Sequence, residues 1–219
     1  MANLRTGKYG DYYGSYYNES EALTQSEMEK NALYIYSYLN DLGWTAEAVA
    51  GLLGNMEHES ALNPGRWEGN DVGEGPGYGL VQWTPYTNLT SWCSSNGWSD
   101  PSEMDANLAR IIYELENGLQ YYSTSGYPLS FREFTQSTES PYYLACAFAW
   151  NYERSWVVLY GSEEEKEALR QLRGGSAQDW YTFLTGLDPI PPSDDTGDGN
   201  QKKRKAMSLL LMYMATRRR

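Results

Sequence analysis

The chain contains 219 residues, of which 41% are hydrophobic and 15% are aromatic, enough for one domain of ordinary size with additional tails. The formal net charge is −12. Because residues 201–219 hold seven Lys or Arg and no Asp or Glu, residues 1–200 carry −19. A body this acidic argues against a nucleic-acid partner, whose field repels it. Cys93 and Cys146 lie in no CxxC motif, which excludes a disulfide framework or zinc-finger spacing and leaves open two buried thiols or one disulfide.

Both ends of the chain differ in composition from its middle. Residues 1–23 are rich in Gly, Tyr, Ser and Asn without periodicity, so we expect an extended N-terminal arm, and its start lacks the apolar segment of a signal peptide. Residues 187–200 are predicted to form an acidic Pro/Gly linker. Residues 201–219 are predicted to form a basic amphipathic tail whose apolar run is too short to span a bilayer. One domain is therefore expected over residues 24–186.

Capping signals and hydrophobic periodicity predict a largely helical domain. The first helix is expected to begin near Ser26, where Ser26 and Glu29 fit a capping box. A second helix is expected from its cap, Thr45, to about Ala61. Further helices are predicted over residues 101–122 (capped by Asp100), 141–153, 162–173 (ended by Gly174-Gly175) and 177–185.

The segment after the second helix predicts the β component of the fold. Residues 65–77 contain five glycines and indicate a loop or a small twisted hairpin. Residues 78–83 are predicted to form a short strand, ended by Thr84-Pro85. The fold class expected from these patterns is mainly α with a small β hairpin or sheet.

One carboxylate in the second helix is placed unusually. On a wheel of ~100° per residue, Glu59 follows Leu52 by seven positions and Met56 by three, so it lies at the edge of the apolar face. His58 points away from that face, opposite Val49. A half-buried carboxyl at the end of a helix is easier to protonate, and a general acid needs that property. The ordinary interpretation, a solvated surface charge, remains open on position alone.

The chain offers little support for metal, thiol or cofactor chemistry. His58 is the only histidine and belongs to no metal-ligand spacing. The glycine-rich run from Gly73 to Gly79 lacks the strand and helix context of a phosphate-binding loop. We therefore expect no metal and no cofactor.

Several strings together resemble a known family. Glu59-Ser60, followed after a loop by Gly79-Leu80-Val81-Gln82, is similar to the goose-type lysozyme and lytic transglycosylase superfamily. The closer resemblance is to the phage tail-type lysozymes, found in tail-tip proteins of short-tailed phages. It covers about residues 26–186 and is carried by Gly43-Trp44-Thr45, Leu53 to Trp67, Gly77 to Pro85, and Tyr152-Glu153-Arg154.

This resemblance implies a lysozyme-like fold and cleavage of the β-1,4 bond between N-acetylmuramic acid and N-acetylglucosamine. It makes Glu59 the general acid and implies that Gln82 binds a sugar acetamido group. Tyr152 resembles the tyrosine that contacts the catalytic carboxyl in transglycosylase relatives, although its neighbours differ. The remaining positions that it marks as substrate-binding are Ser60, Tyr78 and Trp83.

A hydrolase needs a second carboxylate, as nucleophile or to activate water. We expect it in the loop after the second helix, from Glu68, Asp71 or Glu74, with Asp71 favoured because the chain could fold back over the cleft there. A lytic transglycosylase, the first alternative, uses Glu59 alone because a hydroxyl of the sugar closes an anhydro ring. The second alternative is a non-catalytic glycan-binding virion component.

The acidic body and the absence of a signal peptide raise the question of delivery to an anionic wall. The resemblance implies that a phage particle carries the chain to its substrate, peptidoglycan. Residues 201–219 would then dock on a virion protein. A solvated tail, or an interfacial helix on anionic lipid, remains an alternative, and membrane contact is the less favoured one.

Overall fold

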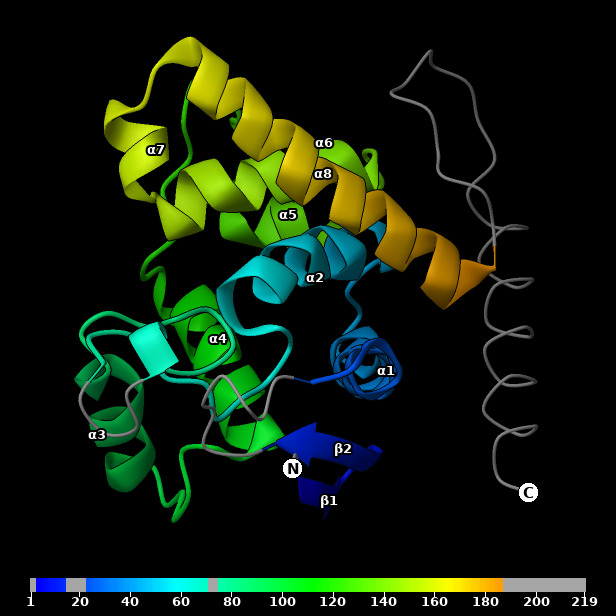
Figure 1. Cartoon of the computed structure of the whole chain (residues 1–219), viewed down its shortest axis with the longest axis vertical. Helices are drawn as coiled ribbons and strands as arrows, with labels where there is room; N and C mark the ends of the chain where they lie inside the picture. Colours follow the sequence, from blue (N-terminus) through cyan, green and yellow to red (C-terminus); the bar gives the residue numbers. More distant parts are fainter. Residues whose placement is uncertain (1–2, 15–22, 71–74, 187–219) are drawn as a thin grey trace.

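The computed structural model describes residues 3–14, 23–70 and 75–186, and these form a mainly helical fold with one two-stranded sheet (Figure 1). The expected fold class is thus confirmed. The elements in chain order are β1 (Asn3–Gly7), β2 (Gly10–Gly14), α1 (Gln25–Asp41), α2 (Ala46–Ser60), η2 (Glu68–Asn70), α3 (Thr87–Ser95), α4 (Met104–Asn117), α5 (Phe131–Gln136), α6 (Pro141–Phe148), the π-helix η3 (Ala149–Glu153), α7 (Trp156–Tyr160) and α8 (Glu163–Thr185).

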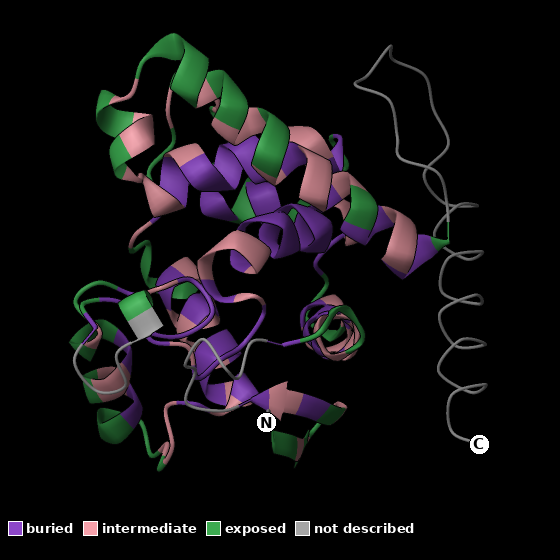
Figure 2. Ribbon diagram, viewed as in Figure 1, coloured by how far each residue is buried: buried purple, intermediate pink, exposed green. Residues whose placement is uncertain are grey.

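Helix α2 is the centre of the core, as its coloration by burial shows (Figure 2). Thr45 caps it as predicted, accepting a hydrogen bond from the Ala48 N–H at 3.1 Å. Two glycines allow neighbouring helices to approach closely. A Cβ at Gly51 would lie 2.8 Å from the Cβ of Leu144 in α6, and one at Gly54 would lie 2.6 Å from the Arg173 carbonyl oxygen in α8. Helix α2 is therefore packed between α6 and α8 at near-backbone contact.

Helix α8 is one continuous helix, so the predicted break at Gly174-Gly175 is wrong. Ser162 and Glu165 form its capping box, and the helix continues to Thr185. Gly174 is needed for packing rather than for a turn, because a Cβ there would meet the ring of Tyr142 at 2.3 Å. Tertiary contacts override the weak helix propensity of glycine here.

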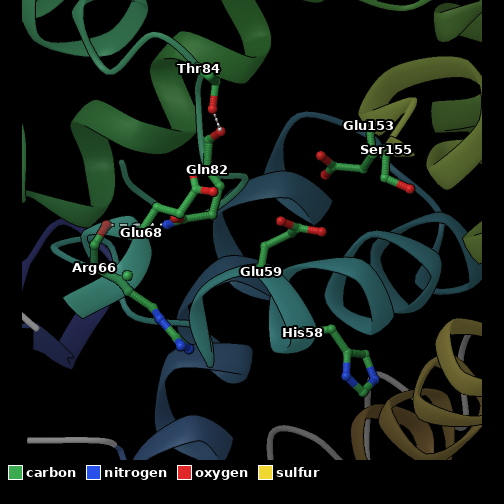
Figure 3. A pocket seen from close by; sticks show the side chains of 9 residues that line it. His58, Glu59, Arg66, Glu68, Gln82, Thr84, Glu153 and Ser155 are labelled. Carbon is green, nitrogen blue, oxygen red and sulfur yellow. Dashed lines mark hydrogen bonds between the residues drawn. The ribbon is translucent and has the colours of Figure 1, made fainter. Parts of the chain in front are cut away.

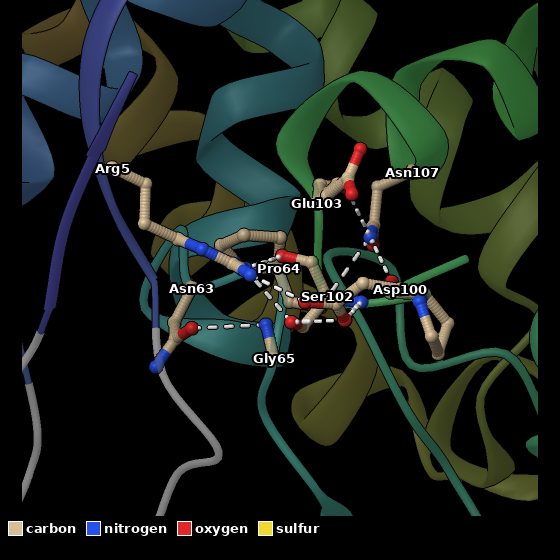
Figure 4. A network of polar contacts seen from close by, with 9 residues as sticks. Arg5, Asn63, Pro64, Gly65, Asp100, Ser102, Glu103 and Asn107 are labelled. Atoms are coloured by element: carbon tan, nitrogen blue, oxygen red, sulfur yellow. Dashed lines mark hydrogen bonds and ion pairs between the residues drawn. The ribbon is translucent and has the colours of Figure 1, made fainter. Parts of the chain in front are cut away.

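The N-terminal segment also differs from its prediction. Residues 3–14 form an antiparallel hairpin, pairing Asn3 with Gly14 and Gly7 with Gly10, instead of an extended arm. The hairpin is tied to the domain by side chains. Asn31 of α1 exchanges two hydrogen bonds with the backbone of Tyr13, and Arg5 contacts the carboxylate of Asp100 and both the hydroxyl and the carbonyl of Ser102 (Figure 4).

Residues 78–83 form a tight turn with isolated bridges from Tyr78 to Trp67 and to Trp83, so the predicted strand is wrong. Positive φ angles at Gly79 and Gln82 reverse the chain. The Leu80 peptide is clamped from both sides, because its carbonyl accepts from the Ser60 hydroxyl at 2.9 Å and its N–H donates to the Asn107 side chain at 2.9 Å. The end of α2, the turn and α4 are thereby joined.

Two helices begin at positions other than those predicted from their capping residues. Helix α1 is capped by Thr24 with Glu27, two residues before the predicted Ser26. Helix α4 begins at Met104, because Asp100 accepts instead from the Ser102 N–H and hydroxyl. Helices α3, α5 and α7 were not predicted, and Cys93 and Cys146 are both buried free thiols.

The predicted linker (187–200) and tail (201–219) lie outside the described residues. Among the residues that the structure describes, no helix combines the length and apolar character that a membrane crossing requires.

The adjacent glycines of α8 provide a test of this packing. Gly175→Ala should raise the free energy of unfolding by about 0.5–1 kcal/mol, since a Cβ there meets no atom within 4 Å and alanine favours a helix. Gly174→Ala should lower it by about 1–3 kcal/mol through overpacking against Tyr142. Urea unfolding of both variants measures the difference, and effects of the same sign would contradict the packing described here.

Candidate active site

A cavity of about 400 Å³ lies beside the C-terminal end of α2. Figure 3 shows the carboxyl groups of Glu59 and Glu153 directed into it, with Gln82 and Glu68 across from Glu153. Segments far apart in the chain therefore meet here. Its lining residues are His58, Glu59, Arg66, Glu68, Gly69, Gln82, Thr84, Glu153 and Ser155.

Glu59 faces this cavity from the last turn of α2 and is held by an arginine. The Arg173 guanidinium of α8 donates to Glu59 Oε1 at 2.6 Å and to the Asn55 carbonyl at 2.6 Å. The side chains of Glu59 and Arg173 are only 19% and 11% exposed, so water screens their attraction weakly. Arg173 was not predicted, because its position depends on the close crossing of α2 and α8.

Glu153 is the second carboxyl directed into the cavity and was also missed as a site residue. It ends the π-helix η3, a geometry that often marks functional positions. The residue as a whole is partly exposed, but its Oε1 atom is shielded from solvent and has no hydrogen-bond partner in the part of the chain that the structure describes. Burial and the negative charge of Glu59 raise the pKa of Glu153 well above its ordinary value, and the Arg173 charge only partly opposes this. These surroundings favour the protonated form of Glu153.

Gln82 lines the cavity opposite Glu153. Its side-chain nitrogen donates to the carbonyls of Gly79 at 2.8 Å and Arg66 at 3.2 Å. Both N–H groups of the amide are thus used by the backbone, so the oxygen Oε1 is the atom that can accept from a ligand. A substrate acetamido N–H is a suitable donor for it.

Four predicted substrate-binding residues do not line this cavity. The Ser60 hydroxyl is buried and bonds to the carbonyls of Met56 and Leu80. Tyr78 is fully buried, with its ring centroid 4.4 Å from that of Trp67. Trp83 is also buried in the core. These three residues pack beneath the Gln82 turn. The fourth, Tyr152, is also buried.

The buried partner of Tyr152 is Glu114, not the Glu59 carboxyl that the resemblance suggested. Glu114 accepts hydrogen bonds from the Tyr152 hydroxyl, from Trp83 Nε1 at 3.0 Å and from Arg110 Nε at 2.9 Å. Burial raises the pKa of Glu114, and these three donors oppose the shift. The network connects α4, the 78–83 turn and η3, so its role is to hold the site together.

His58, which the helical wheel places away from the apolar face of α2, is covered in part by α8. It is partly buried, and its Nε2 lies 2.9 Å from the Ser176 hydroxyl of α8. Burial and the nearby Arg173 charge lower the pKa of His58, which favours its neutral form. Within the described part of the chain, no group of three or more His, Cys, Asp or Glu side chains could hold a metal ion.

Of the three candidates for the second carboxylate, only Glu68 lies within the described residues. Glu68 is exposed at the cavity and its N–H donates to the Gly77 carbonyl at 2.9 Å. Asp71, the favoured residue, and Glu74 lie outside the described residues. Their roles remain predictions.

Two comparisons with known proteins identify relatives of the chain. The chain is 40% identical over 172 residues to "Morphogenesis protein 1" of Bacillus phage B103. This alignment covers 78% of the chain but only 44% of the relative, so the chain spans less than half of that protein. The sequence pattern that defines the phage tail lysozymes matches residues 30–184, which include Glu59, Gln82, Glu153 and Arg173. The chain therefore belongs to the phage tail lysozyme family.

Proposed function

We propose that the chain is a peptidoglycan hydrolase, a muramidase that cleaves the β-1,4 bond between N-acetylmuramic acid and N-acetylglucosamine. The observation that carries this proposal is the position of Glu59, which faces a cavity opposite Gln82 in a member of the phage tail lysozyme family. In the proposed reaction Glu59 protonates the glycosidic oxygen as the bond to the anomeric carbon breaks. Gln82 Oε1 accepts a hydrogen bond from a sugar acetamido group and so sets the register of the glycan.

After the glycosidic bond breaks, a nucleophile must bond to the anomeric carbon. Glu153 is poorly suited to be a nucleophile or base, because burial and the Glu59 charge raise its pKa and disfavour the carboxylate form. For a hydrolase, a loop carboxylate then activates water or attacks directly, and Asp71 remains our first candidate. The raised pKa of Glu153 is also consistent with the alternative, a lytic transglycosylase in which a hydroxyl of the muramic acid attacks and no second carboxylate is needed.

The first test removes the proposed proton donor. Glu59→Gln should reduce clearance of a purified peptidoglycan suspension by at least ~100-fold, the typical contribution of general acid catalysis. Glu57→Gln is the matched control on the same helix. It removes a charge but keeps an acceptor for Trp180 Nε1, which donates to Glu57 at 2.8 Å, and it should clear the suspension normally. A folded Glu59→Gln protein with near-normal clearance contradicts the assignment.

The second test separates the two chemistries by their products. For a muramidase, Asp71→Asn should be more damaging than Glu68→Gln or Glu74→Gln, and mass spectrometry should detect products with reducing ends. Mild and similar effects of all three substitutions, together with anhydro-muropeptides, would establish the transglycosylase instead.

We further propose that the chain reaches the wall as part of a phage particle, a proposal supported by its family and by its similarity to a phage morphogenesis protein. Residues 201–219 would attach it to a virion protein. Residues 1–200 carry a charge of −19, so electrostatic repulsion opposes their approach to an anionic wall by free diffusion. Deleting 201–219 should leave activity on soluble glycan fragments unchanged and remove the protein from purified particles. Loss of activity on soluble fragments would show that this tail belongs to the enzyme.

A further inference from the structure

Two acids near the cavity have opposite surroundings. Glu114 is buried and accepts hydrogen bonds from three side chains, including the cationic Arg110. Glu153 is only partly buried, but its Oε1 is shielded from water and has no partner among the described residues. Ionisation would place negative charge on that unpartnered oxygen, so these surroundings favour the protonated form of Glu153.

The charges that face Glu153 come from three helices: Glu59 of α2, Glu114 of α4 and Arg173 of α8. Glu114 is paired with its own arginine, whereas Arg173 is the cation that pairs with Glu59. Among the described residues, the buried Nε of Arg173 has no hydrogen-bond partner. Two carboxyls, one proton and one guanidinium thus form a neutral set.

We propose that Glu153 stores the proton that Glu59 delivers to the glycosidic oxygen, an inference that rests on the proposed function. The ion pair with Arg173 engages Glu59 as a carboxylate, so the proton that Glu59 delivers must come from another group. Glu153 acts on the substrate only through Glu59, so it is a positioning residue for the proton and not a catalytic residue.

The transfer conserves charge and atoms. The O–H bond of Glu153 breaks, its proton bonds to a Glu59 carboxylate oxygen, and the guanidinium of Arg173 changes partner from Glu59 to Glu153. The set remains neutral before and after, which makes the transfer feasible in a site of low dielectric. Exclusion of water by a bound glycan strengthens the preference for such a neutral set.

Glu153→Gln tests the proposal, because glutamine has the size and neutrality of the protonated acid but no proton to transfer. We expect kcat on a soluble glycan to fall ~10-fold or more at neutral pH, a part of the usual general-acid contribution, with little change in KM. The loss should shrink as the pH falls, since water can then protonate Glu59 directly. A normal kcat with an unaltered pH profile overturns the proposal, and so does a loss that is equal at every pH, which would indicate a structural role.

The same experiment separates this proposal from the proposed function. Glu59→Gln is measured alongside. An inactive Glu59→Gln variant with a normal Glu153→Gln variant refutes only the proton store, whereas full activity of both refutes the muramidase assignment.

A second readout requires no activity. A carboxyl with a raised folded-state pKa contributes stability that is present below its unfolded pKa of about 4.3 and is lost as the pH rises through the folded value. The Tm of the wild-type chain should therefore fall relative to Glu153→Gln as the pH is raised from acidic to neutral and beyond. A Tm difference between the two proteins that does not vary with pH would show that Glu153 titrates as in the unfolded chain, and would overturn the proposal.

Discussion

The ion pair between Arg173 and Glu59 is the contact on which the candidate site depends. It joins residues 114 positions apart in sequence and exists only because α8 crosses α2 at near-backbone distance. Gly54 makes that approach possible, since any side chain there would collide with the backbone of α8 at Arg173. The continuity of α8 through Gly174 is equally necessary, because a break would release the arginine from α2.

The opposite wall of the cavity depends on a different constraint. The turn that presents Gln82 is held by buried polar groups rather than by a sheet. Ser60 binds the carbonyl of Leu80 and Asn107 binds its N–H, which ties the turn to the helix that carries Glu59. Glu114 and Tyr152 then connect this half to η3, where Glu153 lies. Hydrogen bonds in the core thus position each wall of the cavity relative to the other. Such fixed positions suit a site that must align a glycan with a proton-donating carboxyl.

How much of the structure could be predicted depends on how far apart in the sequence the interacting residues lie. Helix α2 and its cap Thr45 were predictable because capping and periodicity act within a few residues, and this periodicity also directed attention to Glu59. The glycines of α8 were misread because their effect is decided by a neighbouring helix, and the aromatic residues of the Gln82 turn were misread because burial cannot be seen in a motif. Arg173 had no local signal, because it is an ordinary helical arginine. Glu153 lay within a string shared with the family, but its role was missed because its properties come from the π-helix and from the surroundings of its Oε1 atom.

Site-resolved ¹³C NMR titration of the glutamate side-chain carboxyls in the intact chain tests the central claim most directly. The account predicts that the Glu153 carboxyl carbon remains in its protonated position at neutral pH, and that the Glu59 resonance responds when Glu153 loses its proton, because the charges of Glu59 and Arg173 both act on Glu153. It also predicts that Arg173→Gln alters the titration of both residues together. Independent titration of Glu153 in the ordinary acidic range, without a response at Glu59, would contradict the account.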